Sequence, residues 1–545
     1  MADEQSPTEK ALEVITNSSL EYPDDQILEC FIENSIDPDD AACYLLKRCT
    51  RNDGFEVASL LSDWKQLVSI FADNPTTVQP KPDKATMIAV ERRDGGKCCI
   101  TGLEGSLMDP LVVRPIVTVP KTLNKSLSEL LDYFIGPETH RQMMEDPALI
   151  AGFQNHWLVR ESTAVALSQG YFQFDFLEDY TYHAAQVSIG GPLYPSILEK
   201  VDVVRPGRFM DHSGSDLPLP NIGFLETISR FSPSIRWLLV GQEIAVKSQR
   251  PAYFIPPLYL LYHRLSEYAA VTLITICRLM PSSLRIPVYR FLGVMGGLIY
   301  GDSSSFKVQR LPFGMYLKTG RVQNFKGLAN EYGALQLLRK STHVPVPRPL
   351  DLTSSGDTCY MLSTQLPGHC LGQCIDSLTE CEIKTLVQDL QNCLNEMRAL
   401  PNEAAPKHAI CNAIGGPCYD FRIVLSMDYD EERGDFVGPF VNEDEFNAIL
   451  QTPALPGVAH HDGHKIVFTH SDLNMRNILM YNGRLAGIVD WENSGWYPDY
   501  WEYTKARFIT KWNKRFLGMV ETVFETLGDY KSELATEQQL WEYCM

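Results

Sequence analysis

The sequence predicts an α+β protein of several domains, in which the C-terminal half folds as two lobes and the N-terminal half contains a smaller α+β domain flanked by helical segments. Three observations lead to this prediction. The chain has 545 residues, enough for three or four domains of ordinary size. Helix-like and strand-like hydrophobic patterns follow one another without a fixed repeat. Beyond residue 301, the elements run from a short sheet with one helix, through a connecting segment, to a long and mostly helical part.

The composition is that of a globular protein. Hydrophobic residues make up 44% of the chain and charged residues 21%, close to the averages for such proteins. The formal net charge of −20 argues against nonspecific binding to nucleic acid or to a membrane of anionic lipid, because both would repel most of the surface. A local basic site would override this argument.

The first residues and the cysteines indicate a cytoplasmic protein. The segment MADEQSPTEK is acidic and polar, unlike a secretory signal. The most apolar stretch, Ala269 to Met280, is too short to span a bilayer and predicts a buried or amphipathic helix. The 14 cysteines have no repeated spacing, which is typical of reduced thiols in the cytosol or nucleus.

The N-terminal half divides into three predicted regions. Residues 1–75 carry apolar residues at three- and four-residue intervals and are expected to be helical, with a possible role in binding a protein partner. A proline-containing linker, Asn74 to Lys84, leads to an α+β domain at residues 86–206. Residues 207–300 are rich in apolar helical segments, and their prolines predict several short helices that connect the two halves.

Residues 301–366 predict a small lobe. The segments FKVQRL and MYLK read as two strands joined by a turn, and GLANEYGALQLLRKS reads as a helix. Alternation in the second strand puts Met315 and Leu317 on one face and Lys318 on the other. Glu331 lies on the apolar stripe of the helix, where a carboxylate is costly unless a cation meets it. Lys318 is the expected partner; a surface lysine with a partly exposed glutamate is the alternative.

Residues 367–545 predict a large helical lobe around one loop-rich segment, IVFTHSDLNMRNILMYNGRLAGIVDWENSG. Here Asp472 is followed by Asn477 after five positions, and by Asp490 after a second hairpin. Phosphoryl transfer needs a carboxylate to orient the attacking hydroxyl, and oxygen ligands to hold Mg²⁺ against the phosphates. These three residues supply that set. The alternative is a solvated loop in which they only cap helices.

The segment resembles the catalytic loop and the metal-binding aspartate of kinases. Ser471 after the histidine, and Asp490-Trp491-Glu492 at the metal site, are similar to the branch that contains aminoglycoside phosphotransferases and choline kinases, and in particular to its fungal members. The resemblance implies a protein kinase-like fold that uses ATP and Mg²⁺. It also implies that Asp472 is the base, and that Asn477 and Asp490 bind the metal.

Other contacts are placed by their order along the chain. Ser303 and Ser304 lie where a phosphate-covering loop is expected, although the full glycine pattern is missing. Thr364 lies in the expected hinge, whose backbone would meet the adenine of ATP. An aromatic and acidic cluster after Asp490 predicts either the core of the large lobe, which we favour, or a site for a cationic hydroxylated molecule; it contains Glu492, Trp496, Tyr497, Asp499, Tyr500 and Trp501.

The segments AVERRDGGKCCITG, DPLVVRPIVTVP and NHWLVRESTAVALSQGYFQF resemble an HNH endonuclease-like module. That module has one histidine that activates water and one that binds metal. Here Arg114 or Pro115 and Ala164 stand at those places, while Asn155 is kept. Without the histidines, a phosphodiester lacks both a general base and a metal ligand. The resemblance therefore implies a degenerate, noncatalytic domain.

Together these features predict an ATP- and Mg²⁺-dependent phosphotransferase that acts on an unidentified hydroxylated small molecule. One alternative is a pseudokinase scaffold, which keeps the fold but acts by binding. A third is a DNA-directed protein that acts through the HNH-like domain.

Overall fold

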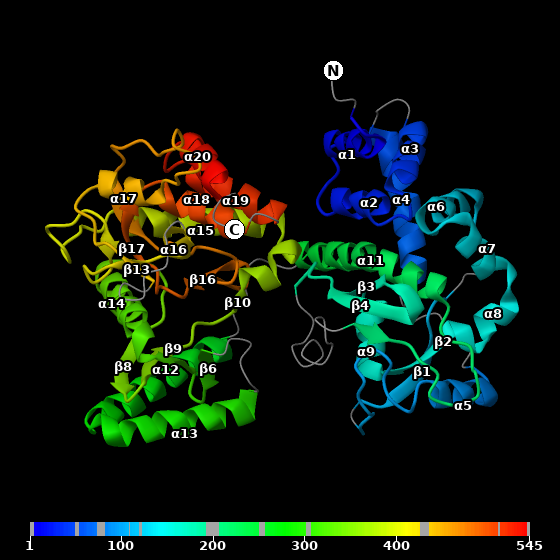
Figure 1. Cartoon of the computed structure of the whole chain (residues 1–545), viewed down its shortest axis with the longest axis horizontal. Coiled ribbons are helices and arrows are strands. Elements are labelled where there is room, and N and C mark those ends of the chain that lie inside the picture. The colour runs from blue at the N-terminus through cyan, green and yellow to red at the C-terminus, as the bar shows by residue number, and fades with distance from the viewer. Residues whose placement is uncertain are drawn as a thin grey trace. The chain divides into compact units, whose positions relative to one another are not determined.

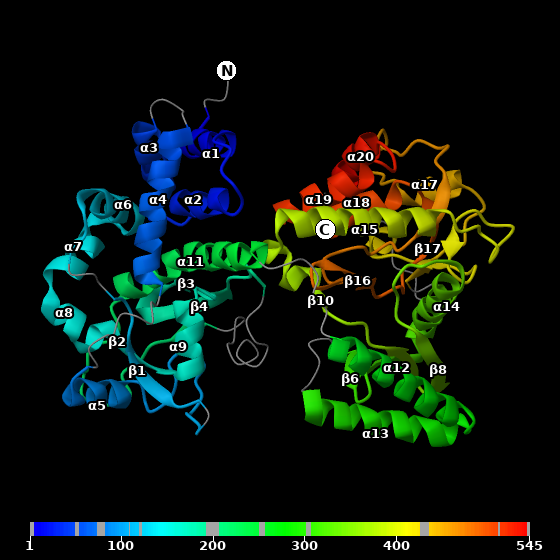
Figure 2. The same ribbon diagram turned by 180° about the vertical axis from the view of Figure 1, so that it is seen from behind.

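The computed structural model describes residues 5–49, 54–72, 82–107, 109–118, 122–191, 206–249, 257–300, 307–425, 435–510 and 513–541. The chain divides into two compact units, Met1–Arg250 and Pro251–Met545 (Figures 1 and 2). Each unit has its own hydrophobic core, and each is described separately.

The first unit begins with the helices expected from the apolar spacing. Trp64, Phe134 and Phe231 are fully buried at its centre, where the Trp64 ring stacks on Phe231 and meets Phe134 edge to face. The predicted linker at residues 74–84 lies mostly outside the described residues. The helices of this unit are α1 (Pro7–Asn17), α2 (Asp24–Glu33), α3 (Pro38–Arg48), α4 (Gly54–Phe71), α5 (Lys84–Arg93), α6 (Lys125–Ile135), α7 (Pro137–Glu145), α8 (Pro147–Ala151), α9 (Glu161–Ser168) and α11 (Ile222–Ser248).

Two small antiparallel sheets complete the first unit. Strands β1 (Leu111–Pro115) and β2 (His156–Arg160) pair with each other, and α9 follows directly. The second sheet has the order β3 (Phe172–Phe176), β4 (Thr181–Gln186), β5 (Gly207–Arg208). Asn155 is buried and its amide donates to the backbone oxygens of Val117 and Ile150, so it holds the loops around the first sheet.

The prediction of several short connecting helices at residues 207–300 is wrong. The region contains three long helices, α11 with 27 residues, α12 (Pro257–Arg278) with 22 and α13 (Ser282–Tyr300) with 19. Helix α11 belongs to the first unit and the other two to the second. Pro233 and Pro287 lie inside helices because each removes only one backbone hydrogen bond, while a buried face on either side of it holds the helix in place.

The small lobe of the second unit is a four-stranded antiparallel sheet in the order β6-β7-β9-β8. Its strands are β6 (Val308–Leu311), β7 (Met315–Arg321), β8 (Pro349–Ser355) and β9 (Thr358–Thr364). One face packs against α14 (Phe325–Ser341), and the other packs against α12 and α13. The predicted alternation along β7 is confirmed, because Met315 and Leu317 are buried against α12 and α13, whereas Lys318 points to α14.

The large lobe is mainly helical and carries three short sheets. One joins β10, β15 and β16, another joins β11, β17 and β14, and β12 pairs with β13. The strands are β10 (His369–Cys370), β11 (Cys411–Asn412), β12 (Cys418–Tyr419), β13 (Phe436–Val437), β14 (Ile466–Thr469), β15 (Ile478–Tyr481), β16 (Arg484–Ile488) and β17 (Gly495–Pro498). The helices are α15 (Glu380–Arg398), α16 (Phe421–Leu425), α17 (Glu443–Leu450), α18 (Trp501–Ile509), α19 (Lys514–Phe524) and α20 (Lys531–Trp541).

Single-turn 3-10 helices lie between these elements in both units. They are η1 (Phe153–Asn155), η2 (Glu178–Tyr180), η3 (Val322–Asn324), η4 (Leu371–Gln373) and η5 (Ile375–Ser377). Among the described helices, none combines the length and the hydropathy that crossing a bilayer requires.

Candidate active site

Lys318, a half-buried residue of β7, lies at the centre of the candidate site. Its Nζ is 2.7 Å from Oε2 of Glu331 on α14 and 2.6 Å from Oδ1 of Asp490, which follows β16. The predicted ion pair between Lys318 and Glu331 is therefore present. Glu331 is only 4% exposed, as expected from its place on the apolar stripe of α14. Asp490 was predicted to bind metal; here it also shares the ammonium group.

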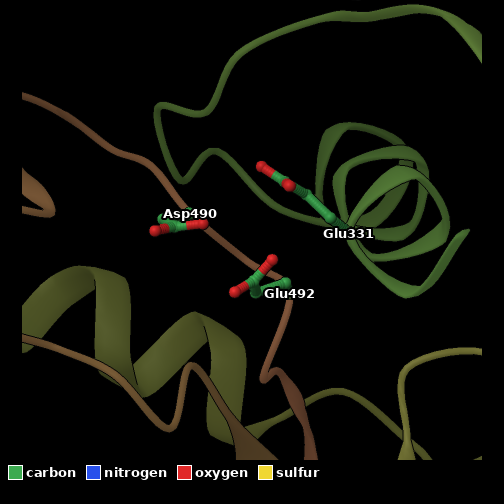
Figure 3. A group of neighbouring side chains, drawn as sticks. All are labelled: Glu331, Asp490 and Glu492. Carbon is green, nitrogen blue, oxygen red and sulfur yellow. The ribbon is translucent and has the colours of Figure 1, made fainter. Parts of the chain in front are cut away.

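Three carboxylates surround this position. The ligand oxygens of Glu331, Asp490 and Glu492 lie within 4.8 Å of one another. Figure 3 shows Glu331 on α14 and, across from it, Asp490 and Glu492 on the segment that follows β16. Trp491, between them, is fully buried in the large lobe. Carboxylates this close repel one another unless a cation lies between them, and carboxylate oxygens are the ligands that Mg²⁺ prefers. The residues thus fit a bound Mg²⁺.

Glu492 was not predicted as a metal ligand. Strand alternation could not have found it, because the segment after β16 is not extended: Asp490 has φ 69° and Glu492 lies in a turn. Asn330 fixes this loop to the small lobe, since its Nδ2 donates to the backbone oxygen of Glu492 at 2.9 Å.

The charges of the cluster perturb one another strongly. Burial opposes the Lys318 ammonium, but Glu331 and Asp490 raise its pKa well above the ordinary value. The pKa of Asp490 is lowered in spite of burial, because Lys318 stabilises the ionised form. Burial raises the pKa of Glu331, and Lys318 only partly opposes this. Burial together with the charge of Asp490 likewise raises the pKa of Glu492. Lys318 alone therefore does not offset the burial and the mutual repulsion of the three carboxylates.

The loop after β14 brings Asp472 and Asn477 together. Asn477 Nδ2 donates to Asp472 Oδ2 at 2.8 Å and to the Asp472 backbone oxygen at 2.8 Å. Asn474 Nδ2 donates to the other carboxylate oxygen at 3.0 Å. Burial, with a contribution from the charge of Asp490, raises the pKa of Asp472 to about 6. Asp472 and Asn477, five positions apart, thus form a hydrogen-bonded pair that lies within the influence of the Asp490 charge.

Backbone strain accompanies this arrangement. Ser471 and Asp490 have φ values of 67° and 69°, a left-handed conformation that is uncommon for residues other than glycine. Glu502 on α18 supports the first of them, because its carboxylate accepts hydrogen bonds from the amides of His470 at 2.6 Å and Ser471 at 3.1 Å. His470 Nε2 contacts the Val489 oxygen at 3.0 Å and connects the loop to the strand that precedes Asp490.

A second buried group lies behind the loop. Asp420 is fully buried and accepts hydrogen bonds from Ser471 Oγ, from Trp501 Nε1 at 3.2 Å and from Lys505 Nζ at 2.6 Å. The positive charge of Lys505 lowers the pKa of Asp472 and so opposes the effect of burial. No local pattern in the sequence marks Asp420 or Lys505, because the contact joins residues more than 80 positions apart.

Thr364 lies at the end of β9, where the hinge was predicted. Its amide donates to the Arg348 oxygen at 3.0 Å, and its hydroxyl accepts from the Arg348 amide at 2.8 Å. Both groups are therefore used inside the sheet, and the structure does not bring the Thr364 side chain into the carboxylate cluster. Ser303 and Ser304 lie outside the described residues.

The aromatic cluster after Asp490 is core, as we favoured. Trp496, Tyr497, Tyr500 and Trp501 are each no more than 2% exposed. Burial raises the pKa of Tyr419 on β12, and acidic groups around it, among them Glu492 and Asp472, add to the effect.

Comparison with known proteins identifies one family. Residues 314–524 match the model of the family described as APH, the phosphotransferase enzyme family. No curated protein matches the chain. The chain is similar to the crystal structure of the aminoglycoside phosphotransferase APH(4)-Ia at 15% identity and a TM-score of 0.30, over 47% of this chain and 86% of that chain. It is also similar to aminoglycoside phosphotransferase APH(3'')-Id from Streptomyces rimosus, in complex with ADP and streptomycin, at 17% identity and a TM-score of 0.28, over 48% of this chain and 92% of that chain.

The matched segment contains Lys318, the three carboxylates and the loop after β14, and the first unit lies outside it. The part of the second unit from residue 314 to residue 524 is thereby assigned to the phosphotransferase enzyme family.

Proposed function

We propose that the second unit is an ATP- and Mg²⁺-dependent phosphotransferase that transfers the γ-phosphate of ATP to a hydroxyl group of a small molecule. The observation that carries this proposal is the meeting of two groups at one place, the Lys318–Glu331–Asp490 cluster and the hydrogen-bonded Asp472–Asn477 pair. An ion pair between Lys318 and Glu331 that served only the fold would not require Asp472, with its raised pKa, beside it.

Asp472 is the proposed general base. With a pKa of about 6 it is mostly ionised at neutral pH, yet basic enough to accept the proton of an attacking hydroxyl. Asn474 and Asn477 hold both carboxylate oxygens, so the base is oriented before the acceptor arrives.

Asn477, Asp490 and Glu492 are the proposed metal ligands. Bound Mg²⁺ supplies charge neutralisation and orientation of the phosphates. Lys318 is proposed to bind phosphate oxygens, and Glu331 to hold its ammonium in place. The proposed roles of Thr364, through the hinge backbone, and of Ser303 and Ser304, at the phosphates, rest on their order along the chain.

The acceptor is proposed to be a hydroxylated molecule that carries positive charge. Acidic groups of the large lobe, Glu492, Asp435 and Asp472 among them, lie close enough to Tyr419 to raise its pKa. They give the region beside the base a negative character, which favours a cation.

Nucleotide binding tests the first half of the proposal. We expect ATP with Mg²⁺, at a hundredfold excess over its dissociation constant, to stabilise the wild type by about 2.7 kcal/mol. Asp490→Ala should lose this effect and stay folded, because Lys318 keeps its pair with Glu331. Asp462→Asn, an exposed acid in the same lobe, is the matched control and should respond like the wild type.

Turnover tests the second half. A screen of hydroxylated metabolites for ATP consumption should find an acceptor, and Asp472→Asn should keep ATP binding but lose turnover. Nucleotide binding without any turnover would favour the pseudokinase scaffold. The absence of both would leave the proposal without support.

For the first unit we propose a degenerate HNH-like domain without nuclease activity. The order β1, β2, α9 and the turn in which Thr101 N donates to Cys98 Sγ at 3.4 Å support the resemblance. Exposed Arg114 and half-buried Ala164 supply neither a base nor a metal ligand at the two histidine positions. Cutting of plasmid DNA with Mg²⁺ or Mn²⁺ would contradict this proposal.

A further inference from the structure

The helices α12 and α13 expose an unusual amount of apolar surface. Of the 23 exposed large hydrophobic residues in the described part of the chain, ten lie on these two helices and Leu279 directly follows α12. Tyr300 lies against Arg310 of β6, at 4.2 Å from the guanidinium carbon to the ring centroid. The other ten are Leu261, Leu265, Tyr268, Ile276, Leu279, Leu284, Phe291, Val294, Leu298 and Ile299. We call them the hairpin face. Scattered exposed apolar residues are normal, but a contiguous group on neighbouring helices indicates an interaction surface.

The hairpin face points away from the sheet. Helix α12 buries Ala270, Ile274 and Cys277 in the same core that holds the sheet residues Leu317 and Leu350. With about 100° per residue, the exposed Leu261, Leu265, Tyr268, Ile276 and Leu279 fall on the opposite side of the helix.

Helix α13 also carries its exposed apolar residues on the side opposite to its buried ones. Its buried residues Ile286, Tyr289 and Leu292 share the core of α12, and the exposed stripe from Leu284 to Leu298 lies opposite to them. In both views of the molecule, the two helices lie side by side on the sheet (Figures 1 and 2). Each stripe is about 20 to 30 Å long at a rise of about 1.5 Å per residue.

The charge of this region is opposite to that of the chain. Residues 257–300 contain four arginines and a single acidic residue, Glu267, whereas the chain as a whole has a net charge of −20. Arg264 and Arg290 are exposed, and Arg290 also donates to the Tyr360 hydroxyl at 2.9 Å. Arg278 and Arg285 pair with Asp351 of the sheet at 3.8 and 3.4 Å, so the region keeps an excess of two positive charges once Asp351 is counted. The patch is thus a local basic site of the kind that overrides the repulsion expected from the net charge.

The charge also discriminates between partners. In a symmetric dimer, two copies of the same basic patch would face each other with one glutamate each, and like charges would be brought together. An anionic lipid surface meets the arginines with opposite charge and receives the leucines and aromatic rings at the level of the headgroups. We propose that the hairpin face docks the second unit on an anionic lipid bilayer, without crossing it.

Docking in this way leaves the candidate active site accessible. Met315 and Leu317 point to α12 and α13, whereas Lys318 points to α14 and the catalytic loop. The sheet therefore separates the hairpin face from the carboxylate cluster. Phe313, in the turn between β6 and β7, is 51% exposed and has φ 62°, and Gly314 beside it lies against Ser266 of α12. We expect this ring to enter the lipid together with the hairpin face.

Flotation of the full-length protein with phosphatidylcholine vesicles, with and without phosphatidylserine, tests the proposal. We expect binding to the vesicles that contain phosphatidylserine, weaker binding at high salt, and partitioning weakened about tenfold or more by Phe291→Ser with Leu298→Ser. Arg264→Glu should weaken binding to the anionic vesicles only. The matched control, Leu177→Ser with Val441→Ser, removes two exposed apolar side chains elsewhere and should bind like the wild type.

Three results would overturn the proposal. They are an absence of binding by the wild type, equal binding with and without phosphatidylserine, and a concentration-dependent dimer in sedimentation velocity that the Phe291→Ser, Leu298→Ser variant abolishes. The altered side chains are exposed, so the thermal midpoint of each variant should stay within a few degrees of the wild type, which separates lost binding from lost folding.

Discussion

We predict that Asp472→Asn raises the free energy of unfolding of the ligand-free protein, because the buried carboxylate of Asp472 destabilises the folded state. Burial raises the pKa of this carboxyl from the ordinary 3.8 to about 6, a difference of about 2 units. At 1.36 kcal/mol per unit, ionising it at neutral pH costs the folded state up to about 3 kcal/mol. Asp472→Asn removes this cost but weakens one of the two amide contacts, worth about 1 kcal/mol. We therefore expect a net gain of about 2 kcal/mol at pH 7.5.

The sign of the pH dependence follows from the direction of the shift. The folded state holds the Asp472 proton more tightly than the unfolded state, so the wild type loses stability as the pH rises from about 4 to about 6. The variant lacks this loss. Its advantage should be present above pH 6 and disappear below pH 4, as measured by urea unfolding at both ends, with Asp462→Asn as the control for a surface carboxyl. A variant that is less stable than the wild type at pH 7.5 would refute the reasoning.

The remaining predictions concern the groups around this carboxyl. Lys318→Met should destabilise the protein by about 3 to 5 kcal/mol in urea unfolding, because it leaves Glu331 buried without its cation. Adding Glu331→Gln should restore more than half of the lost stability, and no restoration would mean that the ion pair is not the cause. Once an acceptor is known, kcat/KM should fall on the acid side with a midpoint near pH 6, since Asp472 must be ionised; a midpoint below 5 would exclude it as the base. Glu502→Ala should cost about 3 kcal/mol in the same unfolding assay, because two buried amides lose their acceptor, and a loss under 1 kcal/mol would argue against this support.

Local patterns in the sequence predicted a large part of the second unit. Alternation in MYLK and the apolar stripe of the next helix located both partners of the Lys318–Glu331 pair, because each partner shows the periodicity of its own element. The spacing from Asp472 to Asn477 predicted a contact within one loop, where few residues leave little freedom.

Contacts between distant segments could not be predicted in this way. Glu502 on α18 and Asp420 before α16 support the loop after β14, and nothing in their own neighbourhoods indicates a partner 31 to 51 positions away. Proline patterns alone do not predict the length of α13, because Pro287 lies inside the helix and packing of its neighbours Ile286 and Tyr289 on the sheet compensates for one missing hydrogen bond.

The left-handed backbone at Ser471 has a consequence for how the active centre forms during folding. The turn is maintained by the carboxylate of Glu502, which lies on α18 and is itself 2% exposed. The loop thus gains its shape only after that helix has docked into the hydrophobic interior. We expect the centre to appear in one cooperative step with the C-terminal helices, so that refolding intermediates that lack them carry the complete HSDLNMRN motif and are nevertheless inert.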